Sequence, residues 1–495
     1  MSKQLDPVAV HGPVVQSPWA ALRSRPAWAA VGLSALALLA EVVPALEPLR
    51  VLGAATATES QPAGVAPPVL TTGEATLKQE TTERPELAQP EHVQIPTGAR
   101  GPIAESKRGP ELKIDVEAPP VPILDPSGHA LDGFFRAVSA TLQKKPGAIT
   151  RVIHFGDSIV TSDYVSGTLR RKLQAELGDA GHGFLLMANA WPAYFHNDVS
   201  RFASAGWSVS RIVGPLSPDG LYGLGGVTFR APPGSRARFG TSKTTQFGNA
   251  VSRFTISYLE QPGGGTLRIN LDGKHLEDVD TNGSAVRVRE KLVRVPDGPH
   301  ELEVVTIKGT TRAFGVVMER DTPGAVLDAI GIQGARIRFL DKQDDAHYAE
   351  QLKWRKPNLL IYQFGANESG DGFAYPMDEY QRTMQDVLRQ GKQAVPEAGC
   401  LIIGAMDRAE KKGTALSTMP VIIAIVKEQR IAAEATGCAF FDTFKAMGGS
   451  GSMAAWVQRG LGQADLTHPT GSGSEVLASW IFRALMQEYT AWTAK

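Results

Sequence analysis

The alternation of apolar and amphipathic segments constrains the fold of this chain most strongly. Apolar runs such as AITRVIHF (148–155), NLLIYQFG (358–365) and GCLIIGAM (399–406) alternate with amphipathic stretches such as 164–177 and 474–489. Continuous apolar strands between amphipathic helices are typical of a parallel sheet that helices cover on both faces. We therefore predict an α/β domain with three layers.

The hydrophobic period changes between about 191 and 325. Segments such as SRFTISYLE (252–260) and HELEVVTIKG (300–309) alternate polar with apolar residues, and turns such as Asp272-Gly273 separate them. This pattern predicts an all-β sandwich at 191–325 that is inserted into the α/β domain. Residues 123–190 then form the first part of that domain and residues 326–495 the second.

The N-terminal residues are typical of an exported protein. Arg23 and Arg25 precede an apolar run at 27–40, whose fourteen residues suit the core of a signal peptide. Counting on to Leu46 gives about the twenty residues of a membrane span, so an uncleaved anchor stays open, as does a buried helix. We predict a signal peptide or N-terminal membrane anchor at 1–50 and a periplasmic or otherwise extracytoplasmic location.

Residues 51–122 are rich in Pro, Thr and Glu and have no apolar period. Such a segment buries too little apolar surface to offset the entropy of ordering, so we predict a disordered linker.

Charge and cysteine content exclude some classes of function. The 51 basic residues balance 51 acidic ones, and no basic stripe is present, so we predict no nucleic-acid partner. Cys400 and Cys438 stand at the starts of two predicted strands. They are either oxidised neighbours in a sheet or two small buried apolar residues, and the second reading is favoured. No cysteine or histidine spacing is typical of a metal site, so no metal is predicted.

Three polar motifs lie where chemistry is expected. Ser158, in Gly-Asp-Ser, follows the first strand and is either a nucleophile or a helix cap. Asp465 and His468 precede the last helix. Either His468 is a base that the carboxylate of Asp465 orients, or both are turn residues. Asn367 follows a middle strand, as an oxyanion donor or a turn residue. Each motif alone is a weak signal.

As an ordered set, these motifs resemble the SGNH, or GDSL-type, hydrolase superfamily over 123–190 and 326–495. The resemblance implies a flavodoxin-like sheet topology and an ester hydrolase that needs no cofactor. It implies Ser158 as nucleophile, His468 as base and Asp465 as orienter.

The same resemblance implies an oxyanion hole. Its donors are the amide of Ser158, the side-chain amide of Asn367 and the amide of a glycine. Gly334 is favoured as that glycine because it follows a strand of the α/β domain, and Gly226 is the alternative. The sequence departs from the family at Ile159, where leucine is usual, and at Glu368, where aspartate is usual.

A narrower resemblance is to bacterial peptidoglycan O-acetylesterases with an inserted carbohydrate-binding-like sandwich. It rests on the export signal, the split domain, GIQGAR (331–336) and AMGGSGSMAAW (446–456). It implies a serine esterase acting on an O-acetylated polysaccharide such as peptidoglycan, with membrane contact only through the N-terminal segment. The alternatives are a glycan O-acetyltransferase with the same residues, another SGNH lipase or esterase, and a non-catalytic glycan-binding envelope protein.

Other polar and aromatic residues near these motifs are predicted to have structural roles. Aromatic residues near the start of the insert either stack on a sugar face or belong to the core. The residues with predicted structural roles are Asp157, His154, His182 and His196. The aromatic residues with these two alternatives are Trp191, Tyr194 and Trp207.

Overall fold

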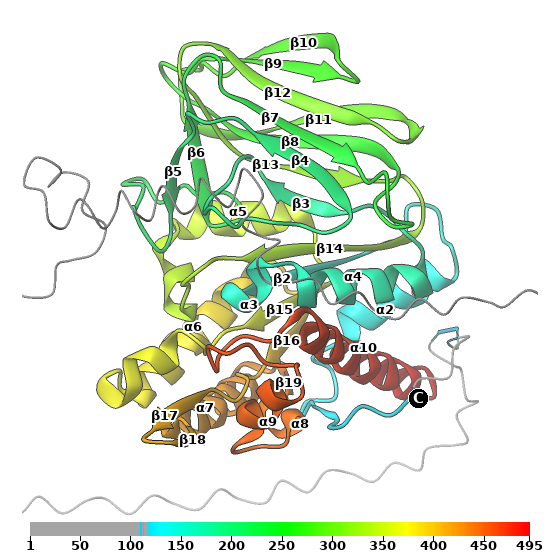
Figure 1. Cartoon of the computed structure of the whole chain (residues 1–495). Coiled ribbons are helices and arrows are strands. Elements are labelled where there is room, and N and C mark those ends of the chain that lie inside the picture. Colours follow the sequence, from blue (N-terminus) through cyan, green and yellow to red (C-terminus); the bar gives the residue numbers. More distant parts are fainter. Residues whose placement is uncertain (1–108, 111, 113–116) are drawn as a thin grey trace, which may run out of the picture. The chain divides into compact units, whose positions relative to one another are not determined.

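The computed structural model describes residues 109, 110, 112 and 117–495. The predicted signal or anchor at 1–50 and most of the predicted linker lie outside the described residues. Among the helices that are described, none has both the length and the apolar composition needed to cross a bilayer. The described chain forms an α/β part and a β-sandwich (Figure 1).

A six-stranded sheet forms the centre of the α/β part, in the order β14-β2-β15-β16-β19-β1. All its neighbouring strands pair in parallel except β1, which is antiparallel to β19. Numbered along the chain, the five parallel strands stand in the order second, first, third, fourth, fifth, which is the predicted flavodoxin-like topology. The strands are β1 (Ile123–Leu124), β2 (Ile149–Gly156), β14 (Gly324–Gly331), β15 (Leu359–Gln363), β16 (Gly399–Ile403) and β19 (Ala439–Phe441).

Alternate residues of the central strands enter two separate hydrophobic cores. In β15, Leu359 and Ile361 pack into one core, while Leu360 and Tyr362 pack into the other. Because successive side chains of a strand point to opposite faces, a sheet covered on both sides needs apolar residues at every position. This explains the continuous apolar runs of the sequence and confirms the predicted three-layer α/β architecture.

Helices on each face complete these cores. One core contains side chains of α2, α4, α9 and α10, and the other contains side chains of α5, α6 and α7. The helices are α2 (Asp132–Leu142), α3 (Ser158–Thr161), α4 (Tyr164–Leu177), α5 (Asp345–Arg355), α6 (Met377–Ala394), α7 (Pro420–Thr436), α8 (Thr443–Met447), α9 (Ser452–Gln458) and α10 (Gly471–Thr493), with 3-10 helices η3 (Ile337–Lys342) and η4 (Glu368–Ala374). A short hairpin, β17 (Ala409–Lys412) and β18 (Ala415–Thr418), follows β16.

Two antiparallel sheets form the sandwich, as the period-two pattern predicts. The first has the order β10-β9-β12-β7-β4, and the second has the order β11-β8-β13-β6-β5, with β3 also pairing with β13. Their strands are β3 (Gly183–Leu186), β4 (Val199–Ala203), β5 (Ser208–Arg211), β6 (Val227–Ala231), β7 (Arg236–Thr241), β8 (Val251–Glu260), β9 (Thr266–Leu271), β10 (Lys274–Asp280), β11 (Arg287–Gly298), β12 (Glu301–Lys308) and β13 (Thr311–Glu319).

Local sequence explains the turns between these strands. Asp272 (φ 49°) and Gly273 (φ 75°) join β9 to β10, and two consecutive positive φ angles are those of the tight hairpin turn that Asp-Gly favours.

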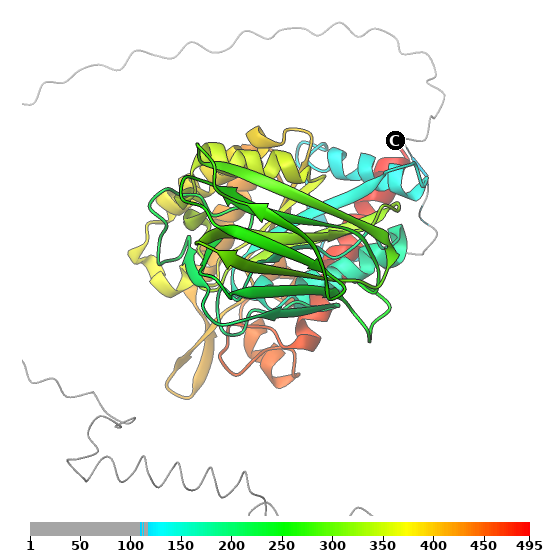
Figure 2. The same ribbon diagram turned by 90° about the horizontal axis from the view of Figure 1, so that it is seen from above.

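The sandwich and the α/β part share one hydrophobic core. Phe155 of β2 and Tyr348 of α5 belong to the same cluster as Phe254 of β8 and Val304 of β12. Viewed from above, the sandwich strands lie across the α/β part (Figure 2). The pairing of β3 with β13 begins at Gly183, so residues before 191 already belong to a sandwich sheet.

A buried ion network reinforces this junction. Arg355 of α5 donates from Nε to Asp328 Oδ2 of β14 (2.6 Å) and from Nη1 to Glu319 Oε1 of β13 (2.5 Å). Glu319 also pairs with Arg151 of β2 (3.0 Å) and with Arg253 of β8. The side chains of Arg355, Glu319 and Asp328 are at most 5% exposed. Burial acts to raise the pKa of Glu319, but the arginines, Arg355 first, hold that pKa well below its usual range.

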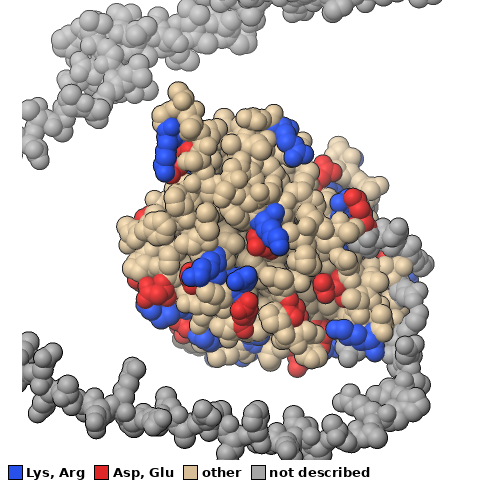
Figure 3. Space-filling model, turned by 90° about the horizontal axis from the view of Figure 1, so that it is seen from below, with Lys and Arg blue, Asp and Glu red and all other residues tan. Residues whose placement is uncertain are grey.

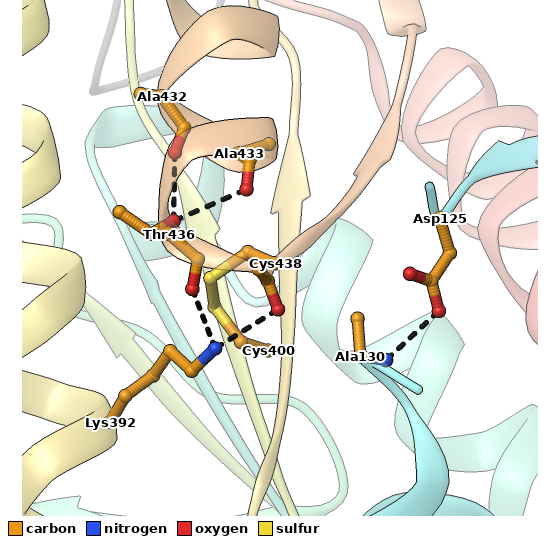
Figure 4. Close-up of a disulfide and its surroundings, with 9 residues drawn as sticks. Asp125, Ala130, Lys392, Cys400, Ala432, Ala433, Thr436 and Cys438 are labelled. Atoms are coloured by element: carbon orange, nitrogen blue, oxygen red, sulfur yellow. Dashed lines mark hydrogen bonds between the residues drawn. A yellow bond between two sulfur atoms is a disulfide. The ribbon is translucent and has the colours of Figure 1, made fainter. Parts of the chain in front are cut away.

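Cys400 and Cys438 form a disulfide between β16 and the residue before β19 (Figure 4). The sequence left this pairing open and favoured two unpaired residues. Both residues are buried, as that reading required, but the parallel pairing of β16 with β19 also brings them together. Beside them, Lys392 Nζ donates to the carbonyls of Thr436 (2.6 Å) and Gly437 (3.0 Å).

The face opposite the sandwich carries acidic and basic side chains side by side (Figure 3). No single-sign stripe is visible on this face of the described chain, in keeping with the balanced composition.

Candidate active site

The turn after β2 presents Ser158 at the carboxyl edge of the sheet. β2 ends at Gly156, where a Cβ atom would lie 2.9 Å from the carbonyl oxygen of Gln363 and still closer to Val160. Only glycine therefore fits where the chain leaves the sheet and enters α3. Asp157 caps α3 by accepting a hydrogen bond from the amide of Ile159 (3.0 Å), and Ser158 is the first helical residue. The helix cap, Asp157, and the candidate nucleophile, Ser158, are thus two adjacent residues.

The structure brings Ser158, His468 and Asp465 together. Ser158 Oγ lies 2.7 Å from His468 Nε2, and His468 Nδ1 lies 2.6 Å from Asp465 Oδ2. The other carboxylate oxygen of Asp465 accepts the amides of Thr467 and His468, each at 3.0 Å. Partial burial acts to raise the pKa of Asp465, but the hydrogen bonds from His468 and Thr467 lower it overall. The carboxylate is therefore ionised and fixes the orientation of the imidazole.

The loop that carries His468 is held at both ends. The backbone N–H of Gln463 donates to the carbonyl of His468 (2.8 Å). Leu466 adopts a positive φ of 61°, which turns the chain between Asp465 and His468. Thr470 caps α10 by accepting the amide of Gly473. The histidine is thus positioned by its own turn and by the start of the last helix.

Two further loops at the same edge place the predicted oxyanion donors. Gly334 follows β14 with a φ of 79°, and Asn367 follows β15. Asn367 Nδ2 donates to the carbonyl of Ala335 (3.0 Å), and this bond joins the two loops. The second N–H of the same side-chain amide remains able to donate to a ligand. The amides of Ser158 and Gly334 donate to no other residue in the described chain.

Gly226 lies elsewhere. It belongs to the turn before β6 of the sandwich, and its amide already donates to the carbonyl of Gly223 (3.2 Å). The amide of Gly226 is thus already used within the sandwich, and the choice of Gly334 stays a prediction.

Two buried carboxyl groups lie beneath the serine. Burial and, less strongly, Glu368 raise the pKa of Asp157 to about 7, and the hydrogen bond from Ile159 opposes this rise. Burial also raises the pKa of Glu368, which accepts the amide of Ile337 (2.8 Å). Asp157 Oδ2 and Glu368 Oε2 have no hydrogen-bond partner among the described residues. Burial therefore disfavours the ionised form of both carboxyl groups.

This predicts a measurable pH dependence of stability. The pKa of Asp157 is about 7 in the folded state and about 3.8 in the unfolded state. Between these two pH values the folded state therefore binds more protons than the unfolded state. The free energy of unfolding therefore falls as pH rises from about 4 to 7. Asp157→Asn keeps the cap and removes the titration, so we expect it to be more stable than the wild type at pH 8, by up to roughly 4 kcal/mol, and equally stable near pH 4.

Urea unfolding across this pH range provides the measurement. Asp442→Asn is the matched control, because Asp442 also caps a helix, α8, but is less buried. If the free energy of unfolding varied with pH in the same way for Asp157→Asn and for the wild type, Asp157 would not titrate in this range.

The histidines predicted to be structural are buried. His154 accepts or donates hydrogen bonds with Gln363 (3.0 Å) and Ser166 (3.1 Å). His182 and His196 lie near Asp163, and the three could together hold a metal ion. However, Arg170 donates to both carboxylate oxygens of Asp163, at 3.1 and 2.8 Å, so the carboxylate is already neutralised and hydrogen-bonded. The donor set therefore forms an ion pair with an adjoining histidine pair and does not fit a cation.

The aromatic residues singled out from the sequence lie mostly in the core. Trp191 and Tyr194 are 5% and 9% exposed, and Trp207 is half-buried against Phe229. The reading of Trp191 and Tyr194 as core residues is thus the one observed. Two neighbouring rings that the sequence did not single out, those of Tyr164 and Phe195, are exposed instead.

The order of the parallel strands is the flavodoxin-like order that the resemblance to SGNH/GDSL-type hydrolases predicts. No protein-family model matches the sequence, and a search of curated proteins finds no match. Among solved structures, the chain is similar to one described as a peptidoglycan O-acetylesterase in action, at 22% identity and a TM-score of 0.64. That similarity covers 74% of this chain and 99% of the other.

Two further solved structures match with much lower scores. One is Axe2, an acetylxylan esterase from Geobacillus stearothermophilus, at 20% identity, a TM-score of 0.25 and coverage of 34% of this chain and 73% of the other. The second is a family two carbohydrate esterase from Cellvibrio japonicus, at 12% identity, a TM-score of 0.24 and coverage of 59% and 98%.

Proposed function

We propose that this protein is a serine esterase that removes O-acetyl groups from a cell-wall glycan such as peptidoglycan. The observation that carries the proposal is the hydrogen-bonded chain from Ser158 through His468 to Asp465 at the carboxyl edge of the sheet. A hydroxyl, an imidazole and a carboxylate in this order are the arrangement that nucleophilic acyl transfer uses. The fold shared with a structure described as a peptidoglycan O-acetylesterase supports the choice of substrate.

The first half-reaction follows from this geometry. Ser158 Oγ attacks the acetyl carbonyl carbon while its proton passes to His468 Nε2. The negative charge on the carbonyl oxygen is stabilised by the amides of Ser158 and Gly334 and by the side chain of Asn367. The bond between the acetyl carbon and the sugar oxygen then breaks, the proton moves from His468 to that oxygen, and acetyl-Ser158 remains.

Water completes the reaction in the second half. His468 takes a proton from a water molecule that attacks acetyl-Ser158, the ester bond to Oγ breaks, and Oγ recovers the proton as acetate leaves. Asp465 stays ionised and stabilises the imidazolium in both halves. A glycan O-acetyltransferase would use the same residues with a sugar hydroxyl in place of this water.

We also propose that the enzyme acts outside the cytoplasm. The disulfide between Cys400 and Cys438 supports this, because disulfides persist in oxidising compartments. The arginine-flanked apolar run at 27–40 supports it independently as a signal or anchor.

Acetate release tests the proposal directly. We expect the purified protein to release acetate from O-acetylated peptidoglycan faster than from acetylated xylan, and to cleave a long-chain ester poorly. Adding an unacetylated glycan acceptor separates the transferase, because a transferase would move the acetyl group to the acceptor and not to water. Absence of acetate release and of transfer from every acetylated substrate would contradict the proposed function.

A further inference from the structure

Three exposed aromatic side chains lie on α4, on β4 and in the segment before β4. Tyr164, Phe195 and Phe202 have exposed fractions of 45%, 47% and 42%, which are high for aromatic side chains. Tyr164 is the first residue of α4 and follows Ser158 by six positions, which even an extended chain spans in about 20 Å. The rings of Tyr164 and Phe195 are neighbours, with centroids 6.4 Å apart. We call these three residues the aromatic platform.

The platform borders a small hollow of mixed polarity. Phe195 and Phe202 line a cavity of about 350 Å³, together with Asn189, His196 and Arg201. The guanidinium of Arg201 stacks on the ring of Tyr194 (4.3 Å) and donates to Asn189 Oδ1 (3.2 Å). Aromatic rings and hydrogen-bonding groups thus line the same cavity, at a volume within the usual range of small-ligand sites, and the guanidinium of Arg238 covers one face of the Phe202 ring (4.7 Å).

The platform is fixed rigidly to the nucleophile helix. Asn197, two residues after Phe195, donates its amide to Asp163 Oδ2 (2.9 Å) and its side-chain Nδ2 to the carbonyl of Asp163 (2.7 Å). Asp163 directly precedes α4 and is also held by the buried Arg170. The loop that carries Phe195 is therefore hydrogen-bonded to the segment that joins Ser158 to Tyr164. Because this loop is already ordered, binding of a ligand to the rings costs little conformational entropy.

We infer that the aromatic platform binds a pyranose ring of the glycan next to the acetylated sugar. A pyranose presents an apolar C–H face, which stacks on aromatic rings, and a rim of hydroxyl groups, which hydrogen-bond to amide and guanidinium groups. An acyl chain has no partners for Asn189 and Arg201, so the mixed lining favours sugar over lipid. The inference rests on the proposed function for the identity of the substrate, but the binding itself does not require turnover.

Two substrates separate binding from chemistry. We expect Phe195→Ala and Phe202→Ala each to lower kcat/KM on soluble O-acetylated peptidoglycan fragments about tenfold, mainly through KM. Activity on 4-nitrophenyl acetate, which carries no sugar ring, should stay within twofold of the wild type. Leu276→Ala is the matched control: Leu276 is 46% exposed on β10, at the opposite edge of the same sheet from β4, and its loss should change neither activity.

A binding measurement keeps the inference testable if no esterase activity is found. Calorimetric titration of the Ser158→Ala protein with the same fragments should show binding that Phe195→Ala weakens about tenfold. No binding by the Ser158→Ala protein, or equal binding with and without Phe195, would overturn the platform whatever the activity. Equal loss of activity on both substrates would also overturn it, because the rings would then support the active site and not the glycan.

Discussion

Replacement of Ser158 by alanine is expected to lower the turnover number for acetate release by about 10⁴-fold or more while leaving the fold intact. In the proposed reaction, the Ser158 hydroxyl, 2.7 Å from His468 Nε2, supplies the oxygen that forms the acyl-enzyme. His468→Ala should have a similar effect, because the base and the nucleophile act as a unit. Asp465→Asn should retain about ten to a hundred times more activity than either, since the orienting carboxylate contributes less.

The measurement is acetate release by purified variants whose unfolding curves match the wild type. Ser162→Ala is a matched control, because Ser162 follows Ser158 by four positions at the end of α3 and has no partner in the proposed chemistry. A folded Ser158→Ala protein that released acetate at the wild-type rate would refute the proposed nucleophile.

Replacement of Arg355 by methionine is expected to destabilise the protein by about 3–5 kcal/mol. Methionine fills similar space but leaves Asp328 without a cationic partner in a site where that side chain is 0% exposed. Glu319 loses one arginine but keeps Arg151 and Arg253, so the largest penalty falls on Asp328. Adding Asp328→Asn should therefore restore part of the lost stability.

Urea unfolding of both variants measures these effects. Arg382→Met is the matched control, because Arg382 pairs with Asp378 at 2.7 Å on the surface, with both side chains more than 60% exposed. An exposed pair of this kind is worth at most about 1 kcal/mol. A loss for Arg355→Met no larger than that for Arg382→Met would show that the network contributes little to stability.

The sequence predicts the α/β elements well because their hydrophobic period is set by burial on two faces. The apolar run 148–155 corresponds to β2, and the amphipathic stretch 164–177 corresponds to α4. Parallel strands also end at a common edge, so polar residues after separate strands can be predicted to lie near one another. Ser158 and Asn367 follow neighbouring strands for this reason.

Features that depend on contacts between distant elements leave no periodic signal. The pairing of Cys400 with Cys438 depends on β16 and β19 being neighbours, which neither strand reveals alone. Arg355 has the sequence context of an ordinary charged residue near the end of a helix, although it is buried. Trp191 and Phe195 lie four residues apart in one irregular segment, yet one is buried and the other exposed. In such a segment the packing of the sandwich decides which ring faces water.

The chain order of the site has a consequence for when activity begins. Ser158 and His468 are 310 positions apart, and His468 is held at the start of α10, which packs in the same core as α4. A chain that is still being synthesised therefore has its nucleophile long before its base. Hydrolysis of esters should begin only when the last helix has docked, so the onset of activity during refolding would report the final assembly of the α/β part.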